Sequence, residues 1–213
     1  MDTDVFLAWL AAAAAAIEAN RDHLTQLDAA IGDADHGTNL ARGFAAVTAA
    51  IEGAAPRPAT PGALLTLTGS TLISKVGGAS GPLYGMALRS AGKALGDTSD
   101  ADLRALAGAL EAALAGVQKL GAAREGEKTM VDALAPAVSA LAKALAEGAP
   151  ADGALAALAA AAAEGAQATI SMQALKGRAS YLGPRSVGHE DPGAASMALI
   201  LGALRDVAAQ QAP

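Results

Sequence analysis

LAAAAAAI at residues 10–17 and ALAALAAAAA at residues 154–163 are the most distinctive runs of this chain. Alanine has the highest intrinsic helix propensity of all residues, and leucine follows closely. Hydrophobic residues make up 53% of the 213 residues but aromatic residues only 2%, whereas β-sheets favour β-branched and aromatic side chains. The sequence therefore predicts an all-α protein whose small side chains let helices pack closely.

Charge and cysteine content exclude several classes of protein. The net charge is −6 and there is no cysteine, which argues against a nucleic-acid surface and excludes disulfides, thiolate zinc sites and cysteine nucleophiles. The start, Met1 to Asp4, is acidic where a signal peptide is basic, and both alanine runs are too short to span a bilayer. We expect a cytoplasmic protein of one domain, residues 1–213, with no nucleic-acid or membrane partner.

Periodicity, capping residues and Gly/Pro breaks predict eight helices. Thr3 is the predicted N-cap of the first, and Ser99 with Asp102 resembles a capping box that opens the fifth. The predicted spans are Thr3–Leu27, Gly37–Ile51, Ala63–Lys75, Gly81–Leu95, Ser99–Leu120, Lys128–Glu147, Asp152–Leu175 and a last helix after Pro192 that ends near Gln210.

A long segment, Lys176 to Gly193, has no clear periodicity and is rich in glycine and charged residues. Structureless loops of this length inside a compact domain are usually functional or disordered. Arg178 is suited to a phosphate because a guanidinium forms bidentate, charge-assisted bonds, although a solvated surface position is the alternative. We favour a functional loop.

Three carboxylates, Asp28, Asp33 and Asp35, lie between the first two predicted helices. Carboxylates so close in sequence repel one another unless cations neutralise them, and oxygen ligands suit Mg²⁺ or Ca²⁺. The spacing is not that of an EF-hand, and Mg²⁺ typically takes a few carboxylates together with substrate phosphates. Turn-forming and capping roles are the alternative.

Two segments combine small residues with a helix start, where free N–H groups and the helix dipole favour phosphate. His36 to Asn39 opens the second predicted helix, and Gly77 to Pro82 leads into the fourth. The second segment is not a Walker A loop, because no Gly-Lys-Ser/Thr follows, and by itself an ordinary interhelix turn explains it equally well.

Together, four motifs resemble those of the L subunit of dihydroxyacetone kinase, which is homologous to the C-terminal domain of the single-chain, ATP-dependent kinases. They are GDADHGTN (32–39), GGASGPLYG (77–85), GEKTMVDAL (126–134) and GRASYLGPRSVGHEDPGA (177–194). The resemblance covers nearly the whole chain. It implies an antiparallel barrel of eight helices with the nucleotide at one end, in agreement with the helix count.

The resemblance also implies the site residues. The implied ligands of two Mg²⁺ ions are Asp28, Asp33 and Asp35, and the implied catalytic residue is Arg178, which would neutralise charge on the transferred phosphoryl group. The implied contacts of ADP or ATP are His36, Gly37, Thr38, Asn39, Ala79, Ser80, Gly121, Met130, Arg178, Asp191, Pro192 and Gly193.

Two positions depart from the family pattern. Ala34 replaces the usual glycine between the last two aspartates, and Glu127 replaces the usual aspartate before Lys-Thr-Met. If the backbone at residue 34 requires a positive φ, alanine strains it by about 1 kcal/mol. We expect little effect on activity from either change.

By this resemblance the chain keeps ADP bound, a phosphohistidine protein (the M subunit of a phosphotransferase system) recharges it to ATP, and the phosphoryl group passes to dihydroxyacetone on a K subunit. An ATP-exchanging kinase of another triose, a tetrose or a carrier-bound fatty acid is an alternative within the family. A regulatory partnership with a transcription factor is another, and an inert helical scaffold would leave the three aspartates unexplained. A homodimer also stays open.

Overall fold

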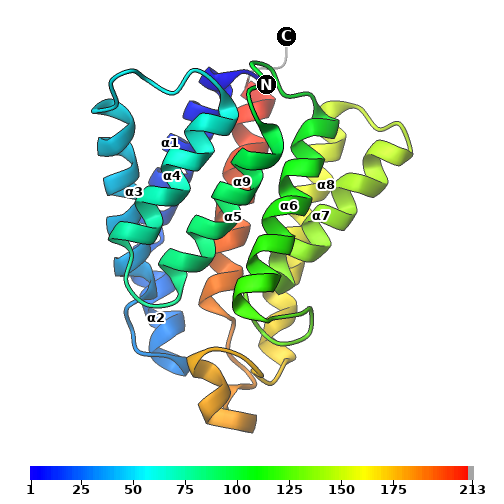
Figure 1. The fold of residues 1–213 in the computed structure, drawn as a ribbon. Coiled ribbons are helices and arrows are strands. Elements are labelled where there is room, and N and C mark those ends of the chain that lie inside the picture. Colours follow the sequence, from blue (N-terminus) through cyan, green and yellow to red (C-terminus); the bar gives the residue numbers. More distant parts are fainter. Residues whose placement is uncertain (211–213) are drawn as a thin grey trace.

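The computed structural model describes residues 1–210, and the regular structure of these residues is helical (Figure 1). It comprises nine α-helices and two short 3-10 helices, η1 and η2. Their bounds are α1 Thr3–Ala19, α2 Arg21–Ile31, α3 His36–Glu52, α4 Pro61–Lys75, α5 Ser80–Leu95, α6 Leu103–Gly121, α7 Val131–Ala146, α8 Ala151–Ala168, η1 Thr169–Ser171, η2 Arg178–Ser186 and α9 Pro192–Gln210.

Eight of the α-helices close into a ring. Each of α3 to α8 packs against the next α-helix in the chain, and α9 packs against α1, which in turn packs against α3. Successive helices of the ring run in opposite directions (Figure 1). The predicted antiparallel barrel of eight helices is therefore confirmed, with α2 as an additional short helix at one end.

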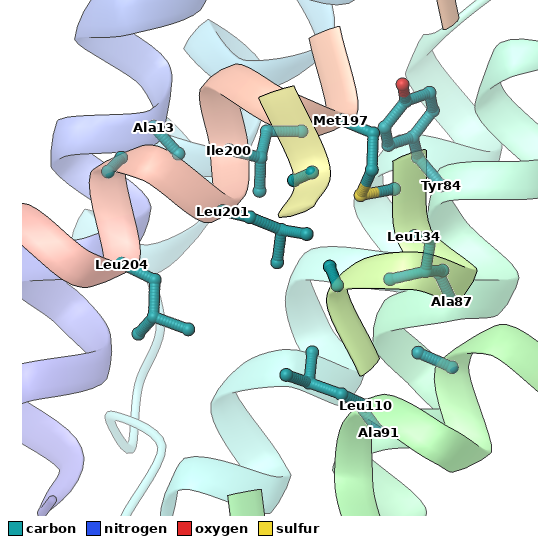
Figure 2. Close-up of a cluster of buried hydrophobic side chains, with 14 of the residues drawn as sticks. Ala13, Tyr84, Ala87, Ala91, Leu110, Leu134, Met197, Ile200, Leu201 and Leu204 are labelled. Carbon is teal, nitrogen blue, oxygen red and sulfur yellow. The ribbon is translucent and has the colours of Figure 1, made fainter. Parts of the chain in front are cut away.

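The interior of the barrel is filled mainly by alanine and leucine, with a few larger side chains. Phe6, Trp9, Phe44 and Tyr84 are all buried. Figure 2 shows one part of this core, where side chains of α9 meet those of α5, α6 and α7. The indole Nε1 of Trp9 donates to the carbonyl of Ile200 at 2.9 Å, so the largest side chain leaves no buried donor unpaired.

Helices α4 and α5 pack closely because glycines face each other across the contact. A Cβ atom at Gly69 would lie 2.5 Å from the carbonyl oxygen of Gly85, and a Cβ at Gly85 would lie 2.5 Å from that of Gly69. No side chain fits at either position without moving the helices apart. The expectation that small residues bring the backbones together is confirmed here.

The first predicted helix is wrong in its extent, because the chain breaks into α1 and α2 at Asn20. The Asn20 backbone leaves the helical region (φ −105°, ψ 10°), and its side-chain amide donates to the carbonyl of Ala16 at 2.8 Å. An asparagine side chain that bonds the backbone in this way competes with helix continuation. The N-cap of α1 is Asp2 rather than Thr3, since the Asp2 carboxylate accepts from the N–H of Val5.

Three other predicted boundaries differ from the structure. Helix α6 is capped by Asp102 itself, which accepts from the N–H of Ala105 at 2.8 Å, and not by Ser99. Helix α7 begins at Val131 because Lys128 has a left-handed backbone conformation (φ 62°). The segment after α8 is not a helix up to Leu175, and the predicted structureless loop contains the 3-10 turns of η2.

Two helical segments, Ala151–Ser171 and Pro192–Gln210, are long and apolar enough to cross a membrane by length and composition alone, each with a mean hydropathy of 1.2. The prediction from the shorter alanine runs overlooked this. Both segments pack within the ring, where α9 contacts α1, α7 and α8. Their place in the barrel accounts for their hydropathy.

Candidate nucleotide and metal site

A cavity of about 350 Å³ opens at one end of the barrel, beside α2 and η2. Its lining is both polar and apolar. The three aspartates, His36, Ser80, Lys128, Arg178 and Asp191 form the polar part of its lining, and Leu83, Val117, Ala123, Met130 and Val131 form the apolar part. A cavity lined by both charged and apolar residues suits a ligand that carries both phosphates and an aromatic base.

The predicted aspartate cluster exists in the folded chain. Each of Asp28, Asp33 and Asp35 offers a carboxylate oxygen, and these oxygens lie within 4.8 Å of one another. Asp28 comes from the last turn of α2, whereas the other two come from the connection between α2 and α3. Such a set of hard oxygen donors matches the preference of Mg²⁺, so the residues fit the metal that the sequence predicts.

Asp28 also organises the turn that carries the other two aspartates. Its Oδ2 accepts from the N–H of Asp35 at 2.8 Å and from that of His36 at 3.1 Å. A side chain at Gly32 would collide with the Asp28 carboxylate, so only glycine fits there. One buried carboxylate thus fixes the start of α3 and leaves its Oδ1 without such a bond to a backbone N–H.

Ala34 has a left-handed backbone conformation with φ 61°, which confirms the conditional expectation from the sequence. Replacing Ala34 by glycine should stabilise the protein by roughly 0.5–1 kcal/mol, because glycine removes the left-handed strain but gains entropy in the unfolded chain. Urea unfolding measures the change. Ala122 is a matched control, since it also has a positive φ (47°) but does not line the cavity. Lower stability of Ala34→Gly would contradict this interpretation.

His36 is buried and held from both sides. Its Nδ1 lies 3.1 Å from the hydroxyl of Ser80, and its Nε2 lies 2.8 Å from that of Ser196. Burial lowers the pKa of His36 below its ordinary value, while Asp28 and Asp35 oppose this effect. The imidazole therefore ties α3 to α5 and α9 beneath the cavity, and both of its nitrogens are engaged within the protein.

Three predicted nucleotide contacts, Gly37, Thr38 and Asn39, do not line the cavity. A side chain at Gly37 would collide with the carbonyl of Arg21, so this glycine serves the close approach of α3 to α2. Asn39 accepts from Arg42 at 2.7 Å. The sequence pattern did not distinguish these packing roles from ligand contacts, and a nucleotide contact at these three positions stays a prediction.

The other predicted nucleotide contacts do line the cavity. Ala79 and Ser80 precede and open α5, Gly121 ends α6, and Met130 precedes α7. Arg178 lies at the cavity mouth, where its Nη2 is 2.9 Å from Oδ2 of Asp33. The Arg178 side chain is 67% exposed, so this ion pair contributes little to stability and leaves the guanidinium accessible to a ligand.

Asp191, Pro192 and Gly193 line the cavity at the start of α9. Asp191 is buried, and its Oδ2 accepts from the N–H of Ala194 at 2.7 Å, as in an N-cap. Burial raises the pKa of Asp191 to about 7, and the hydrogen bond from Ala194 opposes that rise. A titratable group with such a shift at a cavity is typical of a functional site.

Reasoning from the sequence missed two buried charged residues near this cavity, Lys128 and Asp132. Asp132 accepts from the N–H of Gly126 and, at 2.7 Å, from that of Thr129, and so shapes the loop before α7. Both residues lie within the motif at 126–134, so the resemblance of this motif to the family was the signal that could have pointed to them.

Comparison with known proteins is consistent with this site. The DAK2 domain family model matches residues 30–206. The chain is 43% identical to the ADP-binding subunit DhaL of a PEP-dependent dihydroxyacetone kinase of Listeria innocua, over 95% of this chain and 96% of the relative. It is 41% identical to the corresponding DhaL subunit of Escherichia coli, over 91% of each chain.

The fold also matches solved structures of the dihydroxyacetone kinase of C. freundii. The native form gives a TM-score of 0.74 at 26% identity, and the complex with AMP-PNP and Mg²⁺ gives 0.71 at 28%. The match covers 97% of this chain but only 35% and 34% of those chains, so this chain spans about a third of that kinase. The chain therefore belongs to the DAK2 domain family and, within it, to the ADP-binding L subunits of dihydroxyacetone kinase.

Proposed function

We propose that this chain is the nucleotide-carrying subunit of a cytoplasmic, PEP-dependent dihydroxyacetone kinase. It keeps ADP bound, receives a phosphoryl group from a phosphohistidine protein, and passes that group to dihydroxyacetone on a K subunit. One observation carries the proposal: the aspartate cluster and a set of apolar side chains line one cavity at the end of the barrel. The relatives named as ADP-binding subunits of such kinases support it.

Two Mg²⁺ ions, held by Asp28, Asp33 and Asp35, are part of this proposal. Bound there, the metal would supply positive charge that neutralises the terminal phosphates. The chain contributes a rigid turn, since Asp28 holds the N–H groups that fix the position of Asp35. Three carboxylates within 4.8 Å of one another provide the negative charge that two such ions would balance.

The remaining residues bind and orient the nucleotide and neutralise its phosphate charge. The apolar lining residues Leu83, Val117 and Met130 take the base. The turn at Ala79 and Ser80 opens α5, and the free backbone N–H groups of a helix start favour an anion. Arg178 at the mouth offers its guanidinium to the terminal phosphate, where charge develops during transfer. The resemblance assigns the binding of the small ketone to the K subunit.

Exposed apolar side chains support docking of the K subunit at the cavity end. Among residues 1–210, the large hydrophobic side chains that are exposed are Ile73, Leu120, Leu175, Tyr181 and Val187. They lie near the C-terminal ends of α4 and α6 and in the segment around η2, all at the same end of the barrel (Figure 1). Large apolar side chains exposed at the end of the barrel that holds a site of transfer offer contacts to a partner protein.

Replacing Tyr181 by alanine should weaken association with the K subunit about tenfold or more, because a side chain that is 88% exposed has its contacts only in the complex. Arg185→Ala should act in the same direction, since Arg185 belongs to η2 but does not line the cavity. Titration calorimetry measures the association, and retained ADP serves as the control for an intact site. Unchanged association in both variants would place the interface elsewhere.

The proposed function is tested by identifying the nucleotide that survives purification, by mass spectrometry after denaturation. Retained ADP, together with transfer that requires phosphoenolpyruvate and the phosphotransferase proteins, is the expected result. A chain that arrives empty and turns over free ATP would instead be an exchanging kinase component. The transcription regulator suggested by the resemblance and the homodimer, which the sequence left open, stay predictions.

A further inference from the structure

Lys128 is an unusual residue, because a lysine is almost never fully buried. Its side chain is 1% exposed, and its backbone has the left-handed conformation that lysine rarely adopts. The Nζ donates to the carbonyls of Thr169 at 2.7 Å, Met172 at 3.2 Å and His189. All three ammonium N–H groups are therefore used within the protein, and none is free for a phosphate.

The carbonyls that Lys128 binds lie at the two ends of one segment. This segment, residues 169–189, contains η2 and carries Arg178; we call it the lid segment. Its ends are also joined by the N–H of Gly188, which donates to the carbonyl of Ile170 at 2.7 Å. Lys128 is the charged group that joins the two ends of the lid segment, because its one ammonium binds carbonyls from both ends at once.

The loop that carries Lys128 is itself held in place. Asp132 accepts from the N–H groups of Gly126 and Thr129, on either side of Lys128. The carbonyl of Glu127 accepts from the N–H of Leu175 at 3.1 Å, which adds a second link to the lid segment. The loop before α7 and the lid segment are thus connected through Lys128, and both line the cavity.

We propose that Lys128 is a positioning residue for phosphoryl transfer: it holds the lid segment so that Arg178 stays at the cavity mouth. The proposal rests on the proposed function, because it assigns Arg178 to the nucleotide. Lys128 acts through Arg178 and does not itself contact the ligand, since its donors are already bonded to carbonyls. A side chain without N–H donors, such as methionine, would leave these buried carbonyls unpaired and release the lid segment.

The first measurement needs no nucleotide. Chymotrypsin cuts after Tyr181, which is exposed in the middle of the lid segment, and we expect Lys128→Met to be cut about tenfold faster than the wild type in the metal-free protein. Lys143→Met is the matched control, because Lys143 is an exposed lysine on α7. This measurement does not depend on a ligand, so it tests the role of Lys128 even if the wild type binds no ADP. Absence of ADP binding would contradict the proposed function and not the link between Lys128 and the lid segment.

The second measurement is a double-mutant cycle on the dissociation constant of ADP with Mg²⁺. Lys128→Met and Arg178→Ala should each weaken ADP binding about tenfold or more. The double variant should bind ADP as well as the single variant that binds it less tightly. Effects that multiply would mean that Lys128 acts independently of Arg178 and would overturn the proposal. Equal cleavage of Lys128→Met and wild type would overturn it as well.

A third variant guards against general loss of structure. Lys128→Gln keeps two N–H donors, so we expect cleavage and ADP binding between those of the wild type and Lys128→Met. Circular dichroism reports whether each variant keeps its helices. If both substitutions unfold the barrel, Lys128 is a structural residue and the positioning role is rejected.

Discussion

Asp35→Asn should abolish phosphoryl transfer, with a loss of about a hundredfold or more, and leave the helices intact. Asp35 contributes to the oxygen cluster, so its loss weakens the metal and, through the metal, the nucleotide. In the metal-free protein the same change relieves repulsion among carboxylates, and the variant should melt no lower than the wild type. The measurements are transfer with the partner subunits, Mg²⁺ titration, and melting in the presence of a chelator.

Two further variants sharpen this test. Asp22→Asn is the matched control, since Asp22 is an exposed aspartate on α2 that pairs with Arg21 at 3.1 Å and does not line the cavity. Asp33→Asn should also lose transfer, but it additionally breaks the ion pair with Arg178, so its effect is harder to assign. Full activity with unchanged Mg²⁺ affinity in Asp35→Asn would refute the metal site.

Arg178→Ala is expected to reduce both the retention of ADP and the rate of transfer, the latter by about a thousandfold. The guanidinium lies at the cavity mouth beside Asp33, where the terminal phosphate would sit. Arg185→Ala serves as the control within the same segment, because it should retain ADP normally. Normal retention and transfer in Arg178→Ala would leave the lid segment as a connector.

The same prediction has a conformational counterpart. Ordering a segment this rich in glycine costs roughly 1–2 kcal/mol of backbone entropy per residue, which contacts to the nucleotide would have to offset. Cleavage after Tyr181 or Arg185 should therefore be slower with Mg²⁺ and ADP than without them. Equal cleavage rates in the two states would show that the segment does not close over the ligand.

The helical class and most helices could be predicted because alanine and leucine dominate and because glycine and proline separate the runs. The break at Asn20 could not, since asparagine is tolerated inside helices and only its bond to Ala16 reveals the end of α1. The 3-10 turns of η2 were missed for a related reason. They show no 3.6-residue periodicity, and they change direction at Gly183, whose φ is 56°.

The candidate site was predictable where its residues are close in sequence. The aspartate cluster spans eight residues, and comparison with the family pattern singled out Ala34 as a position where a positive φ would strain alanine. Lys128 was not predictable, because the carbonyls it binds lie 41 to 61 residues further along the chain. Likewise, the close approach of Gly37 to the Arg21 carbonyl of α2 could not be predicted, because it depends on how the two helices pack.

The alanine-rich ring has a thermodynamic consequence. A buried alanine gives up no rotamer freedom on folding but removes little apolar surface from water, in contrast to a buried leucine. Ala13, Ala133, Ala137, Ala154 and Ala162 are all fully buried in this barrel. Since the heat capacity of unfolding follows the apolar surface exposed, such a ring has a smaller heat-capacity change per residue than a leucine-filled one. Its stability therefore changes less steeply with temperature, which keeps the frame around the nucleotide steady over a wide thermal range.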